Sequence, residues 1–78
     1  MKYPDGYNGW KNWETWNVWL WATNDPFFYN DLRRSGSWKS FVERQLSLGL
    51  KATLDAAKWD DPAIDTERLE EAYEEEFH

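Results

Sequence analysis

Tryptophan dominates one short stretch of this chain, "GWKNWETWNVWLW" at residues 9–21, where five of thirteen residues carry an indole ring. Each buried aromatic ring removes roughly 150–250 Å² from water, so a few rings can build the core of a small domain. Aliphatic side chains are comparatively scarce elsewhere, and cysteine is absent from the 78 residues. Stability must therefore come from aromatic packing, without help from disulfides.

The apolar residues of this stretch recur at helical spacing. Asn12 is a favourable N-cap, and a first helix is expected over residues 13–23. Its apolar stripe carries Trp13, Trp16 and Leu20, with Trp19 at the edge. We expect Trp13, Trp16 and Trp19 to lie in the core, because helical spacing of this kind is typical of packing faces.

Turn-forming residues divide the following sequence into two shorter helices. The proline after Asp25 forces that residue out of helical geometry and makes it the N-cap of a helix over residues 27–34. Ser37 caps a third helix over residues 38–48. The side chains that point inward by spacing are Phe27, Phe28, Leu32, Trp38 and Phe41.

The C-terminal third contains one ambiguous segment and one clear helix. Residues 50–59 are either a further helical stretch or a looser segment anchored by Leu54 and Trp59. Asp65 is the N-cap of a last helix over residues 66–77, with Ile64 and Leu69 placed as a hydrophobic staple. Its core-facing positions are Leu69, Ala72, Tyr73 and Phe77, and its water-facing positions are Glu70, Glu71, Glu74, Glu75 and Glu76.

These elements predict an all-α fold, a compact single-domain bundle of three to four helices with a Trp-rich core over residues 1–78. Residues 1–11 precede the helices as an irregular arm broken by proline and glycine. The rings expected at the surface are Trp10, Trp21 and Trp59.

Catalytic and metal-binding chemistry is poorly represented. The only histidine is the last residue, and the serines have no base partner, so we expect no enzyme. Asp60, Asp61 and Asp65 lie close in sequence, but the stretch lacks the glycine and closing glutamate of a calcium loop. We therefore expect neither a metal nor a cofactor. No run of 18 apolar residues is present, so a membrane span is not expected.

The charge of the chain is strongly polarised. Residues 60–78 carry nine acids and one arginine, a net −8, against −6 for the whole chain. Such a surface suits a basic protein or ribonucleoprotein better than a nucleic acid backbone. The expected partner-binding residues are Asp60, Asp61, Glu67, Glu70, Glu71, Glu74 and Glu75, with Trp59 or Trp21 as an aromatic anchor. The alternative is that these glutamates form only the solvated face of an amphipathic helix.

The residues from Asn12 to Trp21, followed by Asn24-Asp25, resemble a family of small bacteriophage and mobile-element proteins with the pattern N-[Y/W]-E-T-W-N-V-x-L-W-x-x-N-D. The lead-in "YNGW" and the later turn "WDDPAID" are also similar to that family. This chain departs from it in having "PFF" after Asn-Asp, where a glycine-containing stretch is usual, and in its extra Trp13 and Trp19. No catalytic residue carries over.

The resemblance implies a phage accessory protein made in the cytoplasm of a bacterial host. Small acidic phage proteins often inhibit host defence by occupying nucleic-acid-binding surfaces, so we expect an inhibitor of a CRISPR–Cas or restriction complex, acting as a monomer. One alternative is an assembly module, such as a homodimer, with no inhibitory role. A second is a nucleic-acid binder that uses the basic residues Lys2, Lys11, Arg33, Arg34, Lys39 and Arg44.

Overall fold

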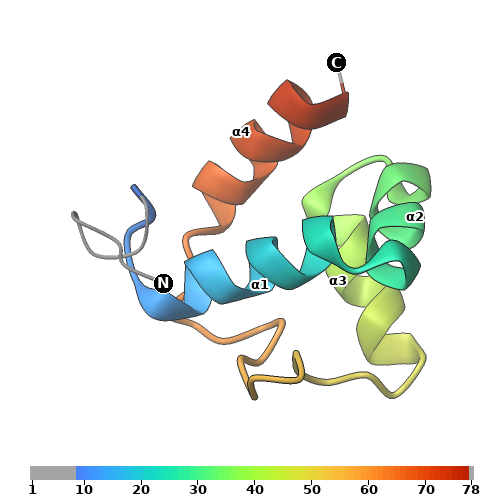
Figure 1. Ribbon diagram of the computed structural model, residues 1–78, viewed down its shortest axis with the longest axis horizontal. Coiled ribbons are helices and arrows are strands. Elements are labelled where there is room, and N and C mark those ends of the chain that lie inside the picture. The colour runs from blue at the N-terminus through green and yellow to red at the C-terminus, as the bar shows by residue number, and fades with distance from the viewer. Residues whose placement is uncertain (1–8, 78) are drawn as a thin grey trace.

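The computed structural model describes residues 9–77, which form four α-helices (Figure 1). These are α1 (Trp13–Asn24), α2 (Pro26–Ser35), α3 (Trp38–Ser47) and α4 (Thr66–Phe77). No extended strand occurs within residues 9–77, where an isolated bridge pairs Ala52 with Lys58. The all-α class is confirmed, whereas most of the expected N-terminal arm, residues 1–8, lies outside the described part of the chain.

Each helix begins at the side-chain cap that the sequence predicts. A side-chain oxygen of the cap accepts a hydrogen bond from a backbone N–H of the first turn, which would otherwise lack a partner. The four caps are Asn12 on Thr15 (2.9 Å), Asp25 on Phe27 (2.9 Å), Ser37 on Ser40 (3.1 Å) and Asp65 on Arg68 (3.2 Å). These bonds span two or three residues, so local sequence is sufficient to specify them.

Two short connections and one long one arrange the helices. Asp25 alone separates α1 from α2, and Gly36, with φ of 86°, begins the turn into α3. A segment of 18 residues, 48–65, then leads to α4, which packs on α3 and α1. In Figure 1, α4 lies on one side of α1 and residues 50–60 run along the opposite side.

Aromatic rings from three helices and the long connection form the centre of the core. Phe41 lies 5.2 Å from both Trp38 and Trp59, measured between ring centroids. Phe28 of α2 also lies 5.2 Å from Trp59, in an edge-on arrangement that aromatic pairs favour. The core positions predicted for Trp38 and Phe41 are therefore confirmed.

The predicted inward face of α1 is wrong. Its buried residues are Thr15, Asn17, Val18 and Ala22, while Trp13, Trp16 and Trp19 are only half-buried. Thr15 and Asn17 can be buried because their polar atoms bond to the connection before α4. The indoles consequently pack at the margin of the core, where Trp19 lies 5.9 Å from both Trp10 and Trp38.

For three other side chains, the expected burial or exposure is wrong. Trp59, predicted at the surface, is 1% exposed, because the looser segment before α4 folds its ring against Trp38 and Phe41. Leu54, predicted as an anchor, is 83% exposed at a turn in that segment. Phe27 is 58% exposed, since α2 turns Phe28 and Leu32 inward instead.

Candidate functional site

Polar side chains at the start of α1 fix the connection that leads to α4. Asn12 Nδ2 donates to the carbonyl of Ala63 at 2.6 Å. Thr15 Oγ1 donates to Asn12 Oδ1 at 2.6 Å and accepts from the backbone N–H of Asp65 at 3.0 Å. Asn12 and Thr15 thus position the turn that follows Asp60 and Asp61. These two residues of the opening motif therefore have a structural role.

Asn17 fixes the middle of the same connection. Its Oδ1 accepts from Thr53 Oγ1 at 2.6 Å, and its Nδ2 donates to Asp55 Oδ2 at 2.9 Å. Trp21 Nε1 donates to that same carboxylate oxygen at 2.9 Å. The hydrogen bonds from Asn17 and then Trp21 lower the pKa of Asp55 below its ordinary value of 3.8. The indole of Trp21, expected to anchor a partner, is half-buried, and its N–H bonds within the chain.

A groove with an acidic rim opens between α3 and residues 59–66. Its volume is about 360 Å³, and it is lined by Trp38, Lys39, Val42, Glu43, Trp59, Asp60, Asp61, Pro62, Ile64 and Thr66. We call this the acidic groove, because it has three carboxylates and a single cation, Lys39, among its lining residues. The backbone N–H of Ala63 donates to Asp61 Oδ1 at 2.8 Å, which fixes that carboxylate. Trp59, expected as an exposed anchor, instead contributes to the apolar wall.

The outward side of α4 carries a second set of carboxylates, which we call the acidic face: Glu67, Glu71, Glu74 and Glu75. All four residues are exposed. Arg68 Nη1 lies 3.9 Å from Glu71 and 3.8 Å from Glu75, while its guanidinium lies 5.0 Å from the ring of Trp10. Exposed ion pairs of this length contribute little stability, so the acidic face remains strongly negative.

Glu70, expected to face water with its neighbours, is half-buried and caps another helix. Its two carboxylate oxygens accept hydrogen bonds from the backbone N–H groups of Trp38 at 2.9 Å and Lys39 at 3.1 Å. Ser37 caps Ser40 on the same turn, so the first N–H groups of α3 are bonded internally and do not form an anion site. Sequence periodicity missed this role because it places Glu70 only relative to its own helix.

Glu76, another glutamate expected to face water, is exposed and bonds to α2. Its Oε2 accepts a hydrogen bond from the hydroxyl of Tyr29 at 3.0 Å. That hydrogen bond raises the pKa of Tyr29 above 10.0. Glu76 therefore ties the end of α4 to α2 and is not part of the acidic face.

Among residues 9–77, no three acidic or histidine side chains gather closely enough to hold a metal ion. Asp65 is occupied instead in capping α4. No helix within that range has the length and apolar character needed to span a bilayer.

Four capped helices around a cluster of aromatic rings define a small all-α domain. The chain belongs to DUF7249, a family of unknown function, whose sequence profile matches residues 4–78. No curated protein and no solved structure matches the chain.

Proposed function

We propose that this chain is a non-enzymatic inhibitor that docks on the basic, nucleic-acid-binding surface of a partner complex. The observation that carries the proposal is the position of the acidic groove. Thr66, the first residue of α4, lines that groove, so the groove opens where the helix bearing the acidic face begins. One cationic surface could engage both features.

The acidic groove suits a lysine or arginine side chain of the partner. Val42, Ile64 and Pro62 offer an apolar wall for the aliphatic stem of such a residue. Glu43, Asp60 and Asp61 supply carboxylates for its charged head. Because the wall lowers the local dielectric constant, a charge pair there is worth more than one on open surface.

The acidic face supplies the longer-range attraction. Glu67, Glu71 and Glu75 recur every four residues on a helix, which presents negative charge at regular intervals to a partner that normally binds phosphates. Like charges four residues apart cost a helix a few tenths of a kcal/mol per pair. The ion pairs of Arg68 with Glu71 and Glu75 relieve part of this repulsion.

The side-chain chemistry supports binding rather than catalysis. Ser35 and Ser47 donate to backbone carbonyls of their own helices, at 2.7 and 2.8 Å, and Ser37 is a helix cap. A serine nucleophile would need a base within hydrogen-bond reach. These three hydroxyls are instead used to stabilise helix ends.

The biological setting in this proposal comes from the resemblance of the "NWETWNVWLW" stretch to phage and mobile-element proteins. We propose that the partner is a host defence complex of the CRISPR–Cas or restriction type, met in the bacterial cytoplasm. Such complexes present the basic surfaces that the acidic groove and acidic face complement.

A panel of purified CRISPR–Cas and restriction nucleases tests the proposal through inhibition of DNA cleavage. We expect at least one complex to be inhibited, with protection when the complex is first loaded with its nucleic acid. The triple variant Glu67→Gln, Glu71→Gln, Glu75→Gln should weaken inhibition at least about tenfold. Failure to inhibit any member of a broad panel contradicts the proposal.

A matched control separates the position of the charge from its total. The variant Asn24→Lys, Leu50→Lys, Leu54→Lys changes the net charge by the same amount, at exposed sites away from α4. We expect this control to inhibit within about twofold of the unaltered protein. Charges far from the acidic face and the acidic groove are largely screened at physiological salt. Equal loss in both variants would mean that only the total charge matters.

A further inference from the structure

A second groove, between α2 and α3, has the opposite character from the acidic groove. Its volume is about 480 Å³, and we call it the α2–α3 groove, lined by Phe27, Asn30, Asp31, Arg34, Arg44 and Leu48. Phe27 and Leu48 are 58% and 50% exposed. Two of the large apolar side chains that residues 9–77 leave exposed therefore border the same hollow.

The backbone around this groove is firmly held. Leu48 directly follows α3, and its N–H donates to the carbonyl of Arg44 at 3.0 Å. Phe27 stands in the first turn of α2, with its ring 5.3 Å from that of Phe28. A preformed apolar hollow costs little ordering entropy when a ligand binds. Exposed apolar side chains gathered in this way typically mark an interaction surface.

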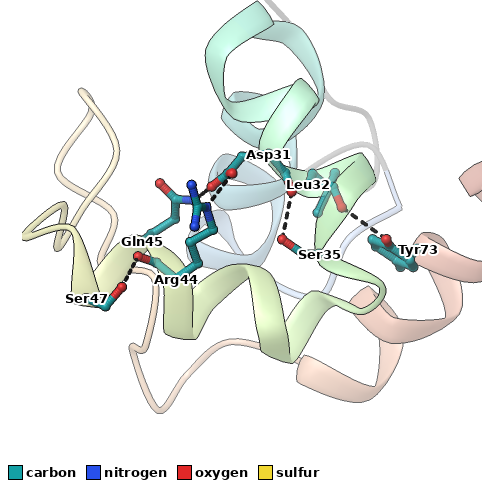
Figure 2. Close-up of polar contacts among 7 residues, drawn as sticks. All are labelled: Asp31, Leu32, Ser35, Arg44, Gln45, Ser47 and Tyr73. Atoms are coloured by element: carbon teal, nitrogen blue, oxygen red, sulfur yellow. Dashed lines mark hydrogen bonds and ion pairs between the residues drawn. The ribbon is translucent and has the colours of Figure 1, made fainter.

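Among residues 9–77, the carboxylate that lines the α2–α3 groove is that of Asp31, and it already accepts two hydrogen bonds. Asp31 accepts hydrogen bonds from Arg44 Nε on one oxygen and from Gln45 Nε2 on the other (Figure 2). The side chain of Arg34 is exposed and makes no hydrogen bond or ion pair with any residue in the range 9–77. Two arginines against one bonded aspartate leave the groove positive, although the chain as a whole carries −6.

We propose that the α2–α3 groove binds a short acidic segment of a partner protein. An apolar side chain of that segment lies between Phe27 and Leu48, and a carboxylate beside it pairs with Arg34. The proposal concerns a different surface from the acidic groove and stands whether or not the acidic groove binds a partner. Together the two grooves would let the chain contact surfaces of both signs.

The composition of the groove favours a peptide over a membrane or a nucleic acid. Stable attachment to anionic lipid requires a broad basic surface or a long apolar face, and nucleic acid binding requires many phosphate contacts. The α2–α3 groove offers two arginines beside two apolar side chains. That combination matches one apolar residue next to one carboxylate.

An amide chemical-shift titration with an amphipathic peptide of leucine and glutamate tests this inference. We expect saturable shifts at Phe27, Arg34 and Leu48, and no such shifts with a peptide in which lysine replaces glutamate. Arg34→Glu and Leu48→Ser should each weaken binding at least about fivefold. The matched controls are Arg33→Glu, on the same helix outside the groove, and Leu54→Ser, an exposed leucine elsewhere; both should bind normally.

Several results would overturn the inference. These are no binding of the acidic peptide, equal weakening by Arg33→Glu and Arg34→Glu, or shifts that map to residues outside the groove. Vesicles containing phosphatidylglycerol and a single-stranded oligonucleotide form the remaining arms. Binding of either at Phe27 and Leu48, in place of the peptide, would assign the groove to a different class of partner. Far-ultraviolet circular dichroism confirms that each variant is folded.

Discussion

Glu70 Oε1, on α4, accepts a hydrogen bond from the backbone N–H of Trp38 at 2.9 Å and so caps the start of α3. Its second oxygen accepts from the N–H of Lys39. The glutamates of the C-terminal helix are therefore of two kinds. Glu70 and Glu76 tie α4 to other helices, while the acidic face points to solvent.

This division predicts different costs for two neighbouring truncations. Glu70→Ala should lower the free energy of unfolding by about 1–2 kcal/mol, because it leaves two backbone donors of α3 without their acceptor. Glu71→Ala, with the same intrinsic change in helix propensity, should alter it by less than about 0.5 kcal/mol. Urea denaturation of both variants provides the measurement. Equal effects would show that the cap contributes no stability.

Two tyrosines allow a second comparison, between a hydroxyl that bonds inside the fold and one that bonds at the surface. The hydroxyl of Tyr73 accepts from the N–H of Gly36 at 2.8 Å and donates to the carbonyl of Leu32 at 3.0 Å. Figure 2 shows Tyr73 reaching Leu32 from α4. Tyr73→Phe should destabilise the fold by about 1–3 kcal/mol, since it removes the hydroxyl that pairs with the buried carbonyl of Leu32 and with the N–H of Gly36.

Tyr29→Phe is the control for that substitution. The hydroxyl of Tyr29 bonds to the exposed carboxylate of Glu76, and water can replace it. We expect a change below about 0.5 kcal/mol in thermal or urea unfolding. A Tyr73→Phe variant as stable as Tyr29→Phe would contradict the role assigned to the buried hydroxyl.

Asn17 is expected to be among the most sensitive positions of α1. Asn17→Ala removes the partner of Thr53 Oγ1 and one donor to Asp55, so the free energy of unfolding should fall by about 2–3 kcal/mol. Asn30→Ala, at an exposed site of α2, should change it by less than about 0.5 kcal/mol. Comparable losses in the two variants would show that the connection does not depend on Asn17.

Asp55 should give the fold a specific dependence on acid. Because hydrogen bonds from Asn17 and Trp21 lower its pKa in the folded state, its contribution is present above its ordinary pKa of 3.8. That contribution is lost as the pH falls through the lower, folded value. In an NMR titration, the carboxyl of Asp55 and the indole N–H of Trp21 should shift together below pH 3.8. A midpoint above that value would contradict the bonding.

Local signals in the sequence were sufficient to predict the helices, because each cap bonds to a residue only two or three positions away. The faces of the helices were harder to predict. Burial of Thr15 and Asn17 depends on partners 36 to 50 residues distant, and periodicity alone treats both as solvent-facing. Trp59 was misplaced for a related reason, since its burial requires the long connection to fold back on α3.

The candidate site was likewise only partly predictable. Because residues 60–78 are rich in acids, the sequence alone predicts Asp60, Asp61 and the outer glutamates of α4 as site residues. Glu43 belongs to the acidic groove but lies on α3, and no sequence signal links it to Asp60. The α2–α3 groove was not anticipated at all, because Phe27 was expected to face the core.

Competition with nucleic acid tests the central claim most directly. The measurement is the apparent inhibition constant of the protein against a sensitive nuclease at rising concentrations of that enzyme's DNA. We predict that the apparent constant rises linearly with the DNA concentration, and that Glu43→Gln with Asp60→Asn raises it at least about tenfold in a folded protein. An apparent inhibition constant independent of DNA and unchanged by the double variant would contradict docking through the acidic groove.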